Sequence, residues 1–126
     1  MKPNLVEKVV SPSLETMQPF SPEELGRPVS DRTASEVKAM MVASVAGGAA
    51  RNARIEGVDV AGKTGTAQNG PSQPYTLWFT GFAPASDPKV AVAVVVENGG
   101  GLGQSGVGNA VAAPIAKQVM EAVLNG

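Results

Sequence analysis

Three short segments with the composition of β-strands follow one another in the second half of the chain, and they constrain the fold more than any other feature. They cover residues 58–67, 75–83 and 89–97 and are rich in valine, threonine and aromatic residues. The joining segments, QNGPSQP and PASDP, contain turn-forming residues and are short enough for hairpins. The sequence therefore predicts three antiparallel strands. The third, KVAVAVVVE, is apolar on both faces, which is typical of a strand buried between two layers.

Two helices are predicted beside these strands, which gives an α+β fold. The first covers residues 34–46, because Thr33 and Glu36 have the spacing of a capping box and a Gly-Gly pair follows as a stop signal. Its apolar face consists of Val37, Met40, Met41 and Val45. The second helix covers residues 112–124, with Pro114 in its first turn. Its inward stripe consists of Ile115, Val119, Met120 and Val123.

The remaining segments are rich in proline or glycine. Five prolines interrupt residues 1–30 and exclude a long helix there. This part is predicted to be an extended connection with one short strand at residues 5–10, leading into residues 31–126, which hold the helices and the sheet. Residues 98–109 form a glycine-rich loop, which is either a mobile loop near a site or a plain connector.

Length and composition exclude several classes of protein. The chain has 126 residues, enough for one domain with a single core. It contains no Cys and no His, which excludes thiol catalysis, metal sites built from these residues and a Ser-His-Asp triad. Acid–base chemistry must then use Lys, Asp, Glu or Tyr. A net charge of −1 argues against a nucleic-acid or membrane-surface protein, and no apolar segment has the length of a signal-peptide core or a bilayer span.

The segment GVDVAGKTGTAQ, residues 57–68, fits two patterns of different meaning. Gly57 to Thr64 matches the phosphate-binding pattern G-x-x-x-x-G-K-[ST], while Lys63-Thr64-Gly65 matches the K-T-G element of penicillin-recognising serine enzymes. A phosphate-binding loop leads directly into a helix, whose N–H groups hold the phosphates. Here Gly-Thr-Ala-Gln-Asn-Gly-Pro follows, which does not favour a helix. The interpretation as a nucleotide-binding loop is therefore rejected.

The K-T-G interpretation gives each residue of the motif a chemical role. On a strand, Lys63 supplies positive charge beside a reacting centre, Thr64 offers a hydroxyl to a substrate carboxylate, and Gly65 lets a substrate backbone approach closely. An unpaired strand edge can also bind an extended peptide, and one of its N–H groups can complete an oxyanion hole. The alternative is a Lys-Thr-Gly tripeptide on an ordinary hairpin.

Longer segments surround this motif. AGKTGTAQ is followed by YTLWFTGFAP, by VAVAVVVEN and by a glycine-rich loop into AAPIAKQVMEAVL, and it is preceded by GRPVSDRTASEVKAMMVASV. Together they resemble the C-terminal part of a penicillin-binding protein transpeptidase domain, in the family's order and over essentially the whole chain. The resemblance is strongest to the monofunctional class B enzymes, which cross-link peptidoglycan. It implies a partial β-lactamase-like fold, an antiparallel sheet covered by helices.

The resemblance also implies a site and its partners. Lys63 would be the catalytic residue on the strand, and Thr66 would offer its backbone N–H to the oxyanion hole. Thr64, Gly65 and Thr66 would contact the substrate. The family needs no cofactor and no metal. The implied partners are the peptidoglycan stem peptide, β-lactams and the N-terminal part of the same domain, with no nucleic acid and no membrane contact by this segment. The parent protein would act at the extracytoplasmic face of the bacterial cytoplasmic membrane.

A complete site of this family also needs a Ser-x-x-Lys nucleophile and a Ser-x-Asn element. Ser35-Glu-Val-Lys38 fits the first pattern, but its neighbours match a different helix of the family. Only a short segment separates it from Lys63, where the family has a long one that includes Ser-x-Asn. No Ser-x-Asn occurs in the 126 residues. The chain is therefore expected to be a C-terminal fragment that is inactive alone. The alternative class is a non-catalytic binding or scaffold domain that reuses the fold.

A few other residues carry weaker expectations. Trp78 and Phe79 on the middle strand are predicted to be core or sheet-face residues, with substrate contact as the alternative. Lys117 and Glu121, four residues apart on the last helix, are predicted to form a solvated ion pair.

Overall fold

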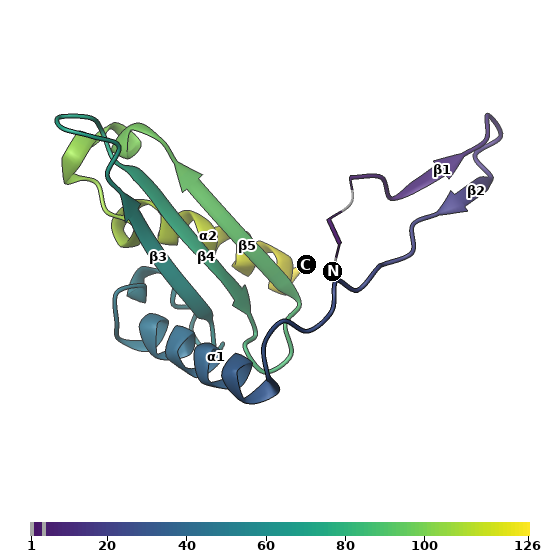
Figure 1. Ribbon diagram of the computed structural model, residues 1–126, viewed down its shortest axis with the longest axis horizontal. Coiled ribbons are helices and arrows are strands. Elements are labelled where there is room, and N and C mark those ends of the chain that lie inside the picture. The colour runs from purple at the N-terminus through teal and green to yellow at the C-terminus, as the bar shows by residue number, and fades with distance from the viewer. Residues whose placement is uncertain (1, 4) are drawn as a thin grey trace. The chain divides into compact units, whose positions relative to one another are not determined.

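The computed structural model describes residues 2–3 and 5–126. The chain divides into two compact units, Met1–Asp31 and Arg32–Gly126 (Figure 1). The first unit contains a two-stranded sheet, and the second contains a three-stranded sheet and most of the helical residues.

The first unit contains a β-hairpin, where the sequence predicted an extended connection with a single short strand. Strands β1 (Lys8–Val10) and β2 (Thr16–Pro19) pair antiparallel. The N–H of Ser11 donates to the carbonyl of Glu15 at 2.9 Å and closes the turn between them. β1 is the second half of the predicted strand. β2 was not predicted because Thr-Met-Gln-Pro has no apolar alternation and ends in proline, which donates no backbone hydrogen bond.

Helix α1 (Asp31–Ala46) is confirmed, but it begins before Thr33, so the predicted capping box does not mark its start. The helix reaches the core only near its C-terminal end, where Val45 is buried. Val37 is 44% exposed and Met40 is 64% exposed, although both belong to the predicted apolar face. Half of that predicted face is therefore uncovered within the described residues.

The predicted antiparallel sheet is also confirmed. Strands β3 (Ala61–Ala67), β4 (Thr76–Ala83) and β5 (Val90–Val96) are neighbours in the order β3-β4-β5. Two short connections make the hairpins, as the turn-forming residues between the strands indicated. The register aligns one residue of each strand across the sheet in rows such as Gly65, Trp78 and Val95.

Helix α2 (Gly108–Asn125) covers one face of the sheet and lies behind the strands in the view of Figure 1. The prediction that four residues of this helix form an inward stripe is wrong except for Met120, which is fully buried. Its other three members are 42% to 52% exposed: Ile115, Val119 and Val123. The buried face instead consists mainly of small residues, which allow close packing on the sheet: Gly108, Ala112, Ala113 and Ala116.

Two further details of α2 bear on the sequence predictions. Because the helix begins at Gly108, Pro114 lies inside it rather than in its first turn. Lys117 and Glu121 form the predicted ion pair, with Nζ 3.7 Å from Oε1 and both side chains partly exposed.

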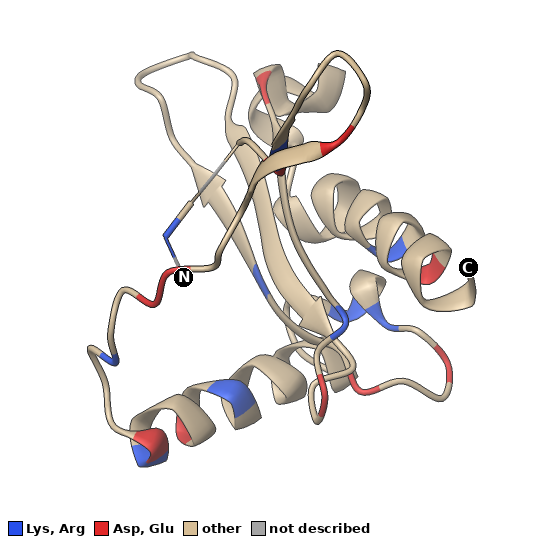
Figure 2. Cartoon of the chain, turned by 90° about the vertical axis from the view of Figure 1, so that its right-hand side faces the viewer, with Lys and Arg blue, Asp and Glu red and all other residues tan. Residues whose placement is uncertain are grey.

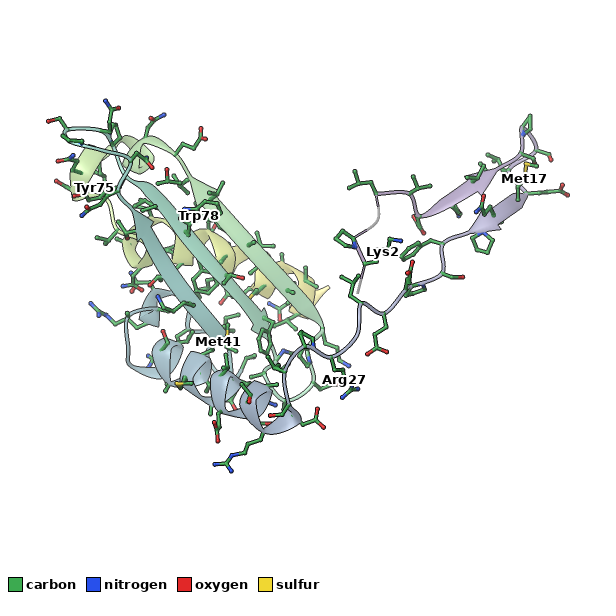
Figure 3. The ribbon with its side chains drawn as sticks, in the orientation of Figure 1. Lys2, Met17, Arg27, Met41, Tyr75 and Trp78 are labelled. Carbon is green, nitrogen blue, oxygen red and sulfur yellow. The ribbon has the colours of Figure 1, made fainter. Side chains whose placement is uncertain are left out.

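The face of the sheet opposite α2 is open in the described part of the chain. Leu77 and Phe79 are buried on the α2 side. Trp78 between them, which is labelled in Figure 3, is 47% exposed. Val95 in the same row is 49% exposed. β5 was expected to be buried between two layers, and that expectation is wrong for the residues described here, because only α2 covers it. The prediction that Trp78 and Phe79 are core or sheet-face residues is consistent with these positions.

Candidate active-site strand

Strand β3 is one edge of the sheet and carries all four residues of the predicted site. It pairs with β4 on one side, and no other described strand pairs with its outer edge. An edge strand presents unpaired N–H and C=O groups, to which an extended peptide can add as a further strand. β3 therefore has the backbone arrangement that the K-T-G interpretation requires.

Lys63 is exposed on β3 and lies opposite Thr80 of β4. It is the one charged residue in the three strands, all of which are described, and Figure 2 shows the charged residues elsewhere in this unit on helices and loops. Its Nζ donates a hydrogen bond to the carbonyl of Thr64. No carboxylate of the described residues forms an ion pair with it. Its positive charge is thus available to an anionic or developing negative group.

Gly65 shares its row with Trp78, on the face that α2 leaves open. A Cβ at this position would lie 3.2 Å from the Trp78 Cβ, which is tighter than an ordinary contact. The lack of a side chain at Gly65 therefore leaves the strand backbone accessible beside the tryptophan.

Thr64 and Thr66 alternate with these residues and share their rows with Phe79 and Leu77, which are buried on the α2 side. The Thr64 hydroxyl donates to the carbonyl of Ala49 over 3.4 Å, a weak contact. The role predicted for this hydroxyl, binding a substrate carboxylate, stays a prediction. The Thr66 hydroxyl accepts a hydrogen bond from the backbone N–H at the start of α2.

The phosphate-loop alternative fails on this geometry. Residues 61–67 are a strand, and a loop without any helix leads from there to β4. Lys63 is therefore not followed in the chain by the helix whose N-terminal N–H groups would hold phosphate groups.

We accordingly expect no specific binding of ATP or GTP to this chain. Titration calorimetry with each nucleotide and magnesium should show no saturable heat, with wild type and Lys63→Ala indistinguishable. Micromolar, magnesium-dependent binding that Lys63→Ala abolishes would contradict this expectation.

Comparison with known proteins supports the serine-enzyme interpretation. The model of the penicillin-binding protein transpeptidase domain matches residues 1–121. The chain belongs to this transpeptidase family. It is 43% identical to the peptidoglycan D,D-transpeptidase PbpA of Mycolicibacterium smegmatis over 98% of its own length and 26% of that protein. It is 36% identical to the stage V sporulation protein D of Bacillus subtilis over 94% of its length and 19% of that protein.

Solved structures agree with the fold of this transpeptidase segment. It superposes on the ceftriaxone acyl-enzyme complex of penicillin-binding protein A from M. tuberculosis with a TM-score of 0.88 and 40% identity, over 97% of this chain and 28% of that one. A transpeptidase domain from Eggerthella lenta gives a TM-score of 0.80 and 36% identity over 94% of this chain and 26% of that one. The chain thus spans about a quarter of the length of these relatives.

The Ser-x-x-Lys pattern of this transpeptidase segment is not part of the β3 site. Ser35 and Lys38 lie in the first half of α1, where every residue is exposed. Both side chains are therefore exposed to solvent within the described residues.

The glycine-rich loop of the transpeptidase segment is tied to the loop between β3 and β4. The Gln104 side-chain amide donates to the carbonyl of Gln73 at 3.0 Å, and the N–H of Tyr75 donates to the carbonyl of Gly103 at 3.2 Å (Tyr75 is labelled in Figure 3). Sequence reasoning missed these contacts, because nothing in the two loops indicates that they meet.

Two further features are absent from the described residues. No group of their Asp and Glu side chains is arranged to hold a metal ion. None of their helices combines the length and apolar character that crossing a bilayer requires.

Proposed function

We propose that this chain supplies the K-T-G strand to the active site of a peptidoglycan D,D-transpeptidase, an enzyme that acts by serine acyl transfer. The observation that carries the proposal is the edge strand β3, which presents Lys63 and Gly65 on an uncovered face of the sheet. The family match and the D,D-transpeptidase names of the relatives support it.

In the proposed reaction, some catalytic groups belong to this chain and others belong to the rest of the domain. A serine outside this segment attacks a carbonyl of the stem peptide while a base takes its proton, and the tetrahedral intermediate then expels the amine, which leaves with that proton and gives the acyl-enzyme. An amine of a second stem peptide then attacks the acyl-enzyme, which forms the cross-link and releases the serine. Lys63 supplies positive charge beside that serine. The backbone N–H of Thr66 donates to the developing oxyanion, and the stem peptide lies along the β3 edge at Gly65. Thr64 contributes its hydroxyl to the substrate carboxylate.

The same site is proposed to react with β-lactams. Two of the M. tuberculosis penicillin-binding protein A structures similar to this chain are acyl-enzyme complexes, one with ceftriaxone and one with imipenem. The rest of the transpeptidase domain is the proposed partner of this segment, and it would cover the open sheet face around Trp78 and the apolar face of α1. Catalysis would then take place at the extracytoplasmic face of the cytoplasmic membrane, where peptidoglycan is assembled.

A segment exchange tests the proposal. This chain replaces the matching segment of M. smegmatis PbpA, to which it is 43% identical, and the chimera is incubated with fluorescent penicillin. We expect covalent labelling of the chimera, because Lys63, Thr64, Gly65 and Thr66 complete its site. PbpA without the segment is the control and should not be labelled. A folded chimera that remains unlabelled would favour a non-catalytic scaffold domain.

A further inference from the structure

The start of helix α2 lies directly against the backbone of the site strand. Gly108, the first residue of α2, is buried, and a Cβ there would lie 2.5 Å from the carbonyl oxygen of Trp78 and 2.6 Å from that of Gly65. It would also lie 3.3 Å from the Gly65 nitrogen. Contacts this short to backbone atoms leave no room for a side chain. The helix can begin at this place on the β3–β4 pair because residue 108 is a glycine.

Hydrogen bonds join the same turn to β3 and to the segment before it. The N–H of Gly108 donates to Thr66 Oγ at 3.3 Å. Asn109 Oδ1 accepts the N–H of Asn52 at 3.0 Å. The segment that holds Asn52 also contains Ala49, whose carbonyl accepts the Thr64 hydroxyl. The two threonines that flank Gly65 are thus both engaged from the side of the sheet opposite the open face.

We propose that Gly108 and Asn109 are positioning residues, which hold the β3 backbone at Gly65 and Thr66 in place for acylation. This inference rests on the proposed function of β3. An edge strand is held by sheet pairing on one side only, so its backbone needs a further support to stay fixed. An oxyanion-hole N–H works only if it is already aimed at the oxyanion, and a shift of about 1 Å can cost up to a hundredfold in rate. The first turn of α2 provides that support.

Gly108→Ala tests the close packing in the complete transpeptidase that contains this segment. The matched control is Gly81→Ala, whose Cβ would lie 2.6 Å from the carbonyl oxygen of Ala61, a similar clash at the opposite end of β3. Stopped-flow kinetics with penicillin separate the first-order acylation constant from the apparent dissociation constant. We expect Gly108→Ala to lower the acylation constant about tenfold, with binding changed less than about threefold. Gly81→Ala should lower the melting temperature similarly, with acylation changed less than about threefold.

Asn109 provides a milder second test that does not depend on a buried clash. Asn109→Ala removes the acceptor for the Asn52 N–H and should slow acylation about fivefold, as expected for one lost hydrogen bond. Asn109→Asp keeps an acceptor oxygen and should restore acylation to within about twofold of wild type. If Gly108 and Asn109 only stabilised the fold, the acylation constant of every variant, including the Gly81→Ala control, would fall in proportion to its loss of melting temperature.

The outcomes separate this inference from the function on which it rests. Wild type that is not acylated at all would overturn the proposed function. Wild type that is acylated normally, with equal acylation constants in Gly108→Ala, Asn109→Ala and wild type, would overturn only the positioning role. Equal slowing by Gly108→Ala and Gly81→Ala would also overturn it. If Gly108→Ala does not fold, the comparison of Asn109→Ala with Asn109→Asp tests the positioning role by itself.

Discussion

Lys63→Ala is expected to slow acylation of the complete transpeptidase by penicillin about ten- to a hundredfold, the loss expected when one charge-assisted contact disappears from the transition state. The structural reason is that Lys63 is the single charge in the three strands and has no ion-pair partner among the described residues, so no neighbouring charge replaces it. The measurement is the second-order rate constant of labelling. Lys89→Ala is the matched control, because Lys89 is exposed, lies just before β5 and pairs with Asp87, so its removal should leave labelling unchanged.

Gly65→Val in the same assay should slow labelling by a different route. A branched side chain would crowd Trp78, whose Cβ would be 3.2 Å from the new Cβ, and would obstruct the strand where substrate must lie. Circular dichroism and the melting temperature of the variant separate a blocked site from a lost fold. Labelling at the wild-type rate in both Lys63→Ala and Gly65→Val would mean that this motif is not at the reacting centre.

The second large effect concerns the 126-residue chain by itself, which should form no covalent adduct with penicillin. Acylation needs a serine whose proton passes to a neighbouring base and which faces an oxyanion hole. The chain holds the Lys63 strand, but its Ser-x-x-Lys pattern lies in the exposed half of α1. Intact mass spectrometry after incubation with a β-lactam should therefore show the unmodified mass. The complete transpeptidase under the same conditions is the positive control.

One result would reverse this expectation. If the chain alone gained the mass of one β-lactam, and Ser35→Ala removed that gain, Ser35 would be a working nucleophile. The proposed division of the site between this segment and the rest of the domain would then be wrong.

The strands could be predicted from the sequence because their signals are local. Valine, threonine and aromatic residues mark the strands, and the turn-forming residues between them set hairpin connections, so strand order and direction followed without knowledge of any other part of the chain. The site strand was predicted for the same reason, since Gly-Pro after the Lys63 motif excludes the helix of a phosphate loop.

Which residues of each helix are buried could not be predicted as reliably as the strands. Apolar periodicity shows that a helix has an apolar face, but the partner of that face is set by the rest of the fold. On α2, alanines pack on the sheet and leave Ile115 and Val119 exposed, because a small face allows a closer approach than a face of branched side chains. On α1, Met40 is exposed because nothing in the described residues covers it.

The support behind the site strand could not be predicted at all. It depends on Gly108 meeting Gly65, which are far apart in sequence, and the GVGN segment looks like any flexible loop. The engagement of the Thr66 hydroxyl from the α2 side is likewise a property of strand register and helix position.

Trp78 gives this chain an internal optical probe. It is the single tryptophan in the sequence, so all indole fluorescence of the chain comes from one position. That position is in the same row as Gly65 and is 47% exposed on the uncovered face of the sheet. A blue shift of emission would therefore report that water has been displaced from the sheet face beside the site strand, and a quencher dissolved in the buffer would report how completely it has been displaced.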